Sequence, residues 1–274
     1  AGALADLRRA AREVGQLGHD LEHERGLFQF RPAVQALRLL AHDRDLTRST
    51  DIASRREFAA RRRGGDWWVG DLDLAEIAKY IDWTFLFTAW ELKGRFPAIL
   101  ENETYGAAAR ELFENAKKLL TGIIDERLLT ANGAYGFWPA ASDGDDIVLF
   151  TDASRSAELT RFPMRRQQIA KTDGKPVACL ADYVAPIDSG REDYVGAFAV
   201  TAGIGCEALA KKFESELDDY NAILTKALAD RLAEAFAERL HQRVRREWGY
   251  GANEILSQDD LIAENYRGIR PALG

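Results

Sequence analysis

GAYGFWPAASDGDDIVLFT, residues 133–151, predicts two strands joined by a hairpin loop. GAYGFW at 133–138 and DIVLFT at 146–151 have the aromatic and β-branched composition of strands. PAASDGD between them is rich in turn-forming residues and predicts a hairpin loop. A connection this short joins antiparallel neighbours, because a parallel pair needs a crossover of roughly a dozen residues or more.

Two more strands are predicted downstream, PVACLADYVA at 176–185 and DYVGAFAVTA at 193–202. The short, turn-rich segment PIDSGRE joins them, which again favours an antiparallel pair. The sheet is therefore expected to be largely antiparallel.

Helices are predicted on both sides of this group of strands. Asp73 is a candidate N-cap, with Glu76 three residues later as in a capping box. Apolar side chains follow the helical period over 106–125 and again over 218–247. The second of these long helices is expected to direct the following residues toward the core: Ile223, Leu224, Ala227, Leu228, Leu232, Ala235, Phe236, Leu240 and Val244.

Residues 1–65 differ in composition from the rest of the chain, because they are rich in arginine and contain no lysine. Their composition favours helices, and one group of apolar residues has helical spacing: Val34, Leu37, Leu39 and Leu40. An arginine-rich stretch then precedes Gly64 and Gly65, a candidate linker. We expect a helical N-terminal region of unknown role at 1–65, followed by an α+β domain at 66–274.

Composition argues against several classes of protein. The 274 residues include 37 basic and 44 acidic side chains, and the net charge of −7 repels a nucleic-acid backbone or an anionic membrane surface. No run approaches the roughly 18 to 20 apolar residues that span a bilayer. The charged N-terminus lacks the apolar stretch of a signal peptide. We expect a cytoplasmic protein without nucleic-acid or membrane partners.

One short motif matches a metal-site pattern. His19, Glu22 and His23 fit H-x-x-E-H, in which two histidines on one helical face could hold zinc beside a glutamate base. Nothing nearby supplies the third protein ligand, and the surrounding segment is strongly charged. A solvated helix face is therefore favoured over a zinc hydrolase, and we expect no metal site.

A glycine pattern and three single residues have structural interpretations. Gly203 and Gly205 begin a G-x-G-x-x-A pattern, but without a βαβ unit a tight strand-to-helix turn is favoured over a nucleotide site. Cys179 and Cys206 lie in apolar runs, which favours buried thiols over a disulfide. His241, with arginines on both sides, is expected at the surface.

Several longer strings carry a family resemblance. They are YIDWTFLFTAWELKGRFPAIL at 80–100, ANGAYGFWPAASDGDDI at 131–147, RRQQ at 165–168, LADYVAP at 180–186, DYVGAFAVTAG at 193–203, LADRLAEAFAERLHQRVRREWGY at 228–250 and ENYRGIRPALG at 264–274. Together they closely resemble the activation, or reactivation, domain of cobalamin-dependent methionine synthase, which binds S-adenosyl-L-methionine (AdoMet). The resemblance runs in order from about Asp71 to Gly274 and does not extend over residues 1–65.

The resemblance implies a C-shaped α+β domain around a twisted antiparallel sheet with long flanking helices, in agreement with the predicted hairpins. It also implies part of a methyltransferase. In this family AdoMet methylates cobalamin that has been oxidised to the inactive cob(II)alamin, and a flavodoxin-type reductase supplies the electron. Cobalamin would be carried by a partner, the cobalamin-binding domain or subunit of methionine synthase. No catalytic residue is assigned to this chain.

The resemblance also places AdoMet-binding positions on particular residues. Asp82 matches the aspartate of the Y-I-D-W string, and Glu234 the acidic residue of the L-A-E-A-F helix. Arg270, Ala272 and Gly274 match the R-x-x-x-G-Y element. An arginine fork suits the AdoMet carboxylate, and an aspartate suits its ammonium group. Asp82 as a helix cap, Glu234 as a surface residue and Arg270 as an ion-pair former remain open as structural alternatives.

Two departures from the family pattern bear on function. Phe85 stands where the family has proline, so the loop after Asp82 is expected to follow a different course. The sequence stops at Gly274, before the tyrosine of the motif and further contact residues, and is expected to be C-terminally truncated relative to the family. Two functions therefore remain open: an AdoMet-binding reactivation module, or a non-catalytic module that binds a corrinoid protein and has lost AdoMet binding.

Overall fold

The computed structural model describes residues 33–39, 60–63, 66–69, 72–168, 177–247, 254–263 and 265–266. The elements are, in chain order, β1 (Ala33–Leu39), β2 (Ala60–Arg63), β3 (Asp66–Val69), α2 (Leu74–Ala78), α3 (Thr84–Ala89), η3 (Ala98–Glu101), α4 (Gly106–Asp125), β4 (Thr130–Asp143), β5 (Asp146–Phe150), β6 (Glu158–Pro163), η4 (Leu180–Tyr183), η5 (Ile187–Ser189), β7 (Asp193–Ile204), α5 (Cys206–Ser215), α6 (Asp219–Glu247) and α7 (Gln258–Ile262). None of the helices within these ranges has the length and apolar character needed to cross a membrane.

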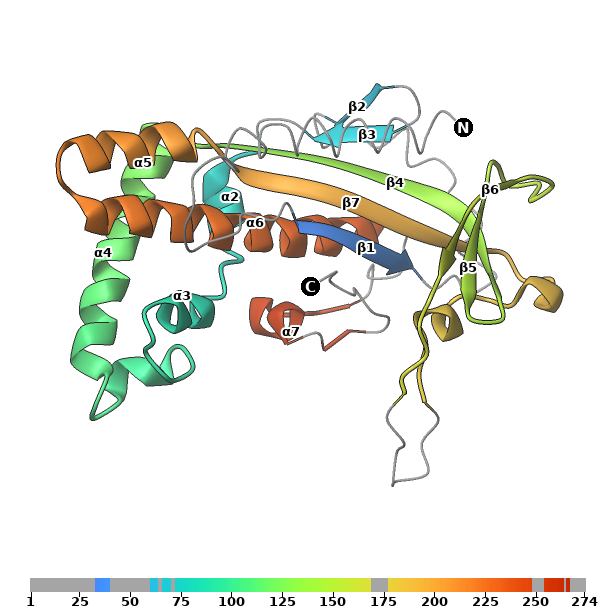
Figure 1. Ribbon diagram of the computed structural model, residues 1–274, viewed down its shortest axis with the longest axis horizontal. Helices are drawn as coiled ribbons and strands as arrows, with labels where there is room; N and C mark the ends of the chain where they lie inside the picture. The colour runs from blue at the N-terminus through green and yellow to red at the C-terminus, as the bar shows by residue number, and fades with distance from the viewer. Residues whose placement is uncertain are drawn as a thin grey trace.

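The seven strands form one curled sheet in which all paired strands are antiparallel. β4 and β7 are the long central strands, flanked by β1 on one side and by β3 and β2 on the other, while β5 and β6 extend from the far end of β4. Figure 1 shows α6 lying along one face of the sheet and α4 descending at one end, which gives the molecule its C shape. The prediction of an α+β fold around an antiparallel sheet is confirmed.

The β4–β5 hairpin is present, but its turn is tighter than predicted. β4 continues through most of PAASDGD and pairs with β5 from Ala140 opposite Leu149 to Asp143 opposite Asp146. Gly144 lies in the turn with φ of 60°, a left-handed conformation that glycine adopts without strain.

The strand predicted at 176–185 is wrong. Residues 180–183 form the short helix η4, which starts where the Asp182 carboxylate accepts a hydrogen bond from the Cys179 amide at 2.8 Å. A side chain that bonds its own local backbone in this way competes with strand pairing. The strand at 193–204, which was expected to pair with 176–185, pairs instead with β1 and β4. A further strand that was not predicted, β6 at Glu158–Pro163, pairs with β5.

The helix predicted around Val34 to Leu40 is also wrong, because residues 33–39 form the edge strand β1. β1 pairs with β7 along its whole length, from Ala33 opposite Val200 to Leu39 opposite Tyr194. The short apolar run AVQALRL does not distinguish strand from helix by itself, and the open edge of β7 settles the choice. The zinc-like motif at His19, Glu22 and His23 lies outside the described residues, as does the rest of 1–32.

The core lies between the sheet and helices α4 and α6. Along α6 the predicted apolar positions are buried or half-buried, except Ile223, whose side chain is exposed. Phe236 is fully buried and packs so closely on Gly133 that a Cβ atom there would lie 3.1 Å from its ring. The predicted helix over 106–125 is confirmed as α4.

The glycine pattern and both cysteines behave as predicted. Gly205 has a φ of 98° at the start of α5, and a Cβ atom there would lie 2.6 Å from the Leu128 carbonyl oxygen. The tight strand-to-helix turn is therefore confirmed. Cys179 and Cys206 are buried free thiols, and burial raises the pKa of Cys206 to about 12.

Candidate functional site

A polar stripe on the C-terminal half of α6 distinguishes this helix from an ordinary core helix. Glu234, Glu238, His241 and Arg245 recur at helical spacing and therefore share one face. His241 is fully buried and Arg245 is 2% exposed, although charged and polar residues seldom lie in the interior without a specific partner. Buried polar groups of this kind indicate a site where binding or precise positioning matters.

The C-terminal segment 254–266 lies against this stripe. The Arg245 guanidinium makes two contacts with the Glu254 carboxylate, Nη2 to Oε1 at 2.5 Å and Nε to Oε2 at 3.2 Å. The same guanidinium lies over the Tyr266 ring, 4.8 Å from its centre. His241 meets that ring edge to face, with 4.8 Å between ring centres. Two neighbouring turns of α6 thus hold both ends of the segment.

The segment has its own local structure. Ser257 Oγ accepts a hydrogen bond from the Asp260 amide at 3.1 Å, and Asp260 Oδ2 accepts one from the Ser257 amide at 3.0 Å. This reciprocal pair caps the start of α7. The hydrogen bonds from Ser257, with a further one from Asn265, lower the pKa of Asp260. Leu261 on α7 is buried.

His241 is the clearest correction to the sequence prediction, which placed it at the surface. Burial, with a smaller contribution from the positive charge of Arg245, lowers the pKa of His241 from its ordinary 6.5 to about 3. The imidazole is therefore neutral near pH 7. Neither ring nitrogen has a hydrogen-bond partner within the described part of the chain.

α6 also holds the segment that carries Asp82. The Tyr80 hydroxyl donates a hydrogen bond to Gln242 Oε1 at 2.6 Å, and the Arg239 guanidinium lies 5.9 Å from the Tyr80 ring centre. Arg231 lies over the Phe85 ring at 5.2 Å. Residues 80–85 are thus fixed on the stretch of α6 that contains Glu234.

Asp82 has both a structural contact and a free oxygen. Its Oδ1 accepts a hydrogen bond from the Thr84 amide at 2.9 Å and so orders the start of α3, as the helix-cap alternative anticipated. Its side chain is half-buried, and Oδ2 contacts no hydrogen-bond donor among the described residues. Glu234 is also half-buried. The structure brings the elements of Asp82 and Glu234 together, while Arg270, Ala272 and Gly274 lie outside the described residues.

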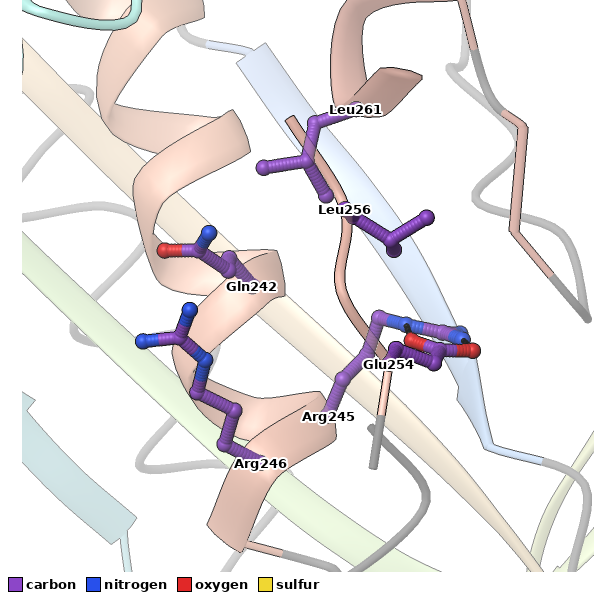
Figure 2. A pocket seen from close by; sticks show the side chains of 6 residues that line it. All are labelled: Gln242, Arg245, Arg246, Glu254, Leu256 and Leu261. Carbon is purple, nitrogen blue, oxygen red and sulfur yellow. Dashed lines mark hydrogen bonds and ion pairs between the residues drawn. The ribbon is translucent and has the colours of Figure 1, made fainter. Parts of the chain in front are cut away.

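A small recess lies beside the Arg245–Glu254 pair. Figure 2 shows Gln242, Arg245 and Arg246 reaching it from α6, with Glu254, Leu256 and Leu261 opposite. Its volume is about 10 Å³, room for about one water molecule, and far below the roughly 300 to 1,000 Å³ of typical small-molecule pockets. This recess by itself does not hold a molecule as large as AdoMet. In the described ranges no three histidine, cysteine or acidic side chains gather as a metal site.

The sequence did not nominate Arg245, Glu254 or Tyr266. Tyr266 lies within one of the strings that carry the resemblance, but no pattern pairs it with a helix about 20 residues earlier. The S-x-x-D spacing of Ser257 and Asp260 is a readable capping signal and could have located α7.

Comparison with known proteins identifies the class to which this fold and site belong. Residues 73–274 match the family described as vitamin B12 dependent methionine synthase, activation domain, and the chain belongs to this family. Its structure is similar to the crystal structure of the MetH reactivation domain bound to AdoHcy, with 48% sequence identity and a TM-score of 0.71. That similarity covers 78% of this chain and 66% of the other, a little under two thirds.

Proposed function

We propose that this chain binds AdoMet between α6, residues 80–85 and the C-terminal residues, and serves as the reactivation module of a cobalamin-dependent methionine synthase. In this role it supports reductive methylation of cob(II)alamin to methylcobalamin with electrons from a flavodoxin-type reductase. The main support is the 48% identity to a reactivation domain solved with AdoHcy. AdoHcy is the product that remains when AdoMet loses its methyl group.

The described residues fit such a ligand. Asp82 Oδ2 is a half-buried carboxylate oxygen without a donor among them, and it suits the AdoMet ammonium group. Glu234 offers a second carboxylate on the adjacent helix. In the proposed site the Arg270 fork takes the AdoMet carboxylate, and the backbone of Ala272 and Gly274 allows close approach of the nucleoside.

Chain length is compatible with a single site. Tyr266 packs on His241, and Glu234 lies seven residues earlier on α6, about 10 Å along the helix axis. Arg270 is the fourth residue after Tyr266, a distance of at most about 14 Å for an extended chain. Arg270 can therefore reach the level of Glu234.

The chemistry needs a second component. Cobalamin, carried by the cobalamin-binding domain or subunit, would be the methyl acceptor: one electron from the reductase would convert cob(II)alamin to cob(I)alamin, whose cobalt electron pair would form the bond to the methyl carbon while the carbon–sulfur pair leaves with sulfur as AdoHcy. Asp82, Glu234 and Arg270 take no part in bond making. They hold the charged amino-acid end of AdoMet, so that binding orients the sulfonium methyl toward the partner.

Titration calorimetry of AdoMet into the chain tests this proposal. We expect micromolar binding, weakened in Arg270→Ala by about 2 to 4 kcal/mol, or roughly 30- to 900-fold. Asp82→Asn should weaken binding less, because it removes charge but retains a hydrogen-bonding oxygen. Arg161→Ala, on the distant β5–β6 hairpin, is the matched arginine control and should leave the affinity unchanged.

Absence of AdoMet binding by the unaltered chain would contradict the proposal. That result would favour the alternative, a non-catalytic module that binds a corrinoid protein. Equal affinity in Arg270→Ala would instead show that AdoMet binds but that the assignment of Arg270 is wrong.

A further inference from the structure

The contact between α6 and the C-terminal segment centres on a buried arginine. The Arg245 side chain is 2% exposed, whereas its partner Glu254 is 25% exposed. Taking a guanidinium this far out of water is costly, and the cost is offset only where partners satisfy its charge and its hydrogen-bond donors in good geometry. Two of its partners come from the two ends of one segment, Glu254 at its start and Tyr266 at its end.

We infer that Arg245 is a positioning residue for AdoMet binding: by pairing with Glu254 and stacking on Tyr266, it fixes the course of the chain that leads to Arg270. This inference rests on the proposed function, because it concerns how the AdoMet-binding residues are presented. Arg245 itself is not assigned a contact with AdoMet.

The geometry requires arginine rather than any cation. Its planar guanidinium presents Nε and Nη2 side by side to the Glu254 carboxylate and at the same time covers the Tyr266 ring. A lysine ammonium can pair with the carboxylate, but it cannot make the bidentate contact or stack in the same way.

The surroundings of Arg245 support the same role. His241 lies one turn earlier on α6 and contacts Tyr266, the ring that Arg245 also contacts. Its imidazole is neutral near pH 7. A neutral ring adds no positive charge of its own next to the Arg245 guanidinium. Within the segment, the Ser257–Asp260 cap orders the start of α7, and α7 contacts α6 with Leu261 buried. The segment is thus fixed at three points, and the last lies four residues before Arg270.

The test measures AdoMet affinity by calorimetry in Arg245→Met, Arg245→Lys and Glu254→Gln, at a temperature where each variant is folded. Arg245→Met should weaken AdoMet binding by about tenfold or more, equivalent to ~1.4 kcal/mol. Arg245→Lys should recover part of the loss, because it restores the charge. Adding Glu254→Gln to Arg245→Met should cost little more, since the two residues act through one contact.

Two further variants keep the test decisive. Tyr266→Leu removes the second contact without leaving a buried charge unpaired, and should also weaken AdoMet binding severalfold. Arg166→Met is the matched control, because Arg166 also pairs with two carboxylates, those of Asp145 and Asp182, on a different part of the sheet. It should leave the affinity unchanged.

Hydrogen exchange separates positioning from general stability. In Arg245→Met, exchange should rise over residues 254–266 and stay unchanged in α4. If the unaltered chain binds AdoMet and Arg245→Met binds it equally well, the inference is overturned while the proposed function stands. The same conclusion follows if the variant only melts at a lower temperature with unchanged affinity. If the unaltered chain does not bind AdoMet, both fail.

Discussion

Two regions of this molecule use the same chemistry, arginine with carboxylates, in opposite surroundings. At the corner of β4, β5 and η4, Arg161 and Arg166 each contact two or more carboxylates, with about a third of their side chains exposed. On α6, Arg245 pairs with the Glu254 carboxylate and is 2% exposed. Exposed pairs are screened by water and contribute little, whereas a buried charge depends strongly on its partner.

The difference shows where the molecule requires a fixed geometry. Arg161 joins strands that are already paired as hairpins, and Arg166 joins the β4–β5 turn to η4 through groups that water reaches. These contacts are expected to add little stability, and in that sense the corner is redundant. Arg245 joins α6 to a segment outside the sheet, whose short helix cannot bury much surface by itself. The buried pair is therefore the contact on which the position of the C-terminal segment depends.

The largest expected effect is that of Arg245→Met on stability. Removing the guanidinium leaves Glu254 without its main partner, and breaking a buried ion pair typically costs 3 to 5 kcal/mol. Because Glu254 is partly solvated, we expect the lower end, about 3 kcal/mol, from denaturant unfolding. A loss in the free energy of unfolding no larger than that caused by Arg166→Met would contradict the proposed difference between the two regions.

The next effect is a pH dependence that comes from His241. Its pKa is about 3 in the folded protein and 6.5 ordinarily, so the unfolded chain takes up the proton first as pH falls. The contribution of His241 to the free energy of unfolding is therefore fully present above about pH 6.5. Below that pH the free energy of unfolding falls by up to ~1.4 kcal/mol per pH unit. Between pH 8 and pH 5 the loss is about 2 kcal/mol.

His241→Leu isolates that contribution. Urea unfolding between pH 5 and pH 8 should give a flatter stability profile for the variant than for the unaltered chain. Parallel profiles would show that His241 is solvated or protonated in the folded protein, and would place it with the exposed groups.

A smaller effect is expected at the α7 cap. Ser257→Ala removes the hydroxyl that accepts from the Asp260 amide, and loss of such a cap costs about 1 kcal/mol. The change should appear as faster hydrogen exchange over 254–266 with little change in the midpoint of global unfolding. Equal acceleration throughout α6 would show that the segment and the helix open together.

Arg166→Met should have the smallest effect on stability. Its guanidinium lies between Asp145 and Asp182, which raises the pKa of Arg166 and lowers that of Asp182, but water reaches all three groups. High salt should reduce even this contribution, because exposed pairs are screened. A loss in thermal unfolding as large as that of Arg245→Met would contradict the assignment of this corner as redundant.

The same two regions show how far sequence reasoning reaches. The β4–β5 hairpin, α4, α6 and the turn at Gly205 were predictable, because each is set by local spacing or by a backbone conformation that favours glycine. β1 was not predicted, because a seven-residue apolar run fits both the helical and the strand period. Its partner strand, β7, lies about 160 residues away in the sequence.

The candidate site was predictable only in part. The resemblance assigned Asp82 and Glu234, which the structure places on elements packed against each other. The burial of His241 and the pairing of Arg245 with Glu254 come from how the C-terminal segment returns to α6. The spacing of residues along α6 does not by itself predict this contact with the C-terminal segment. The arginines on either side of His241 led instead to the prediction of a solvent-exposed side chain.

Methyl transfer is the measurement that tests the central claim most directly. The chain is mixed with a cobalamin-binding domain of methionine synthase in the cob(II)alamin state, a flavodoxin-type reductase and AdoMet carrying a labelled methyl group. Reactivation predicts label on cobalamin and one AdoHcy for each methyl group transferred, with both lost in Arg270→Ala. AdoMet binding without any transfer of label in the complete mixture would contradict the claim.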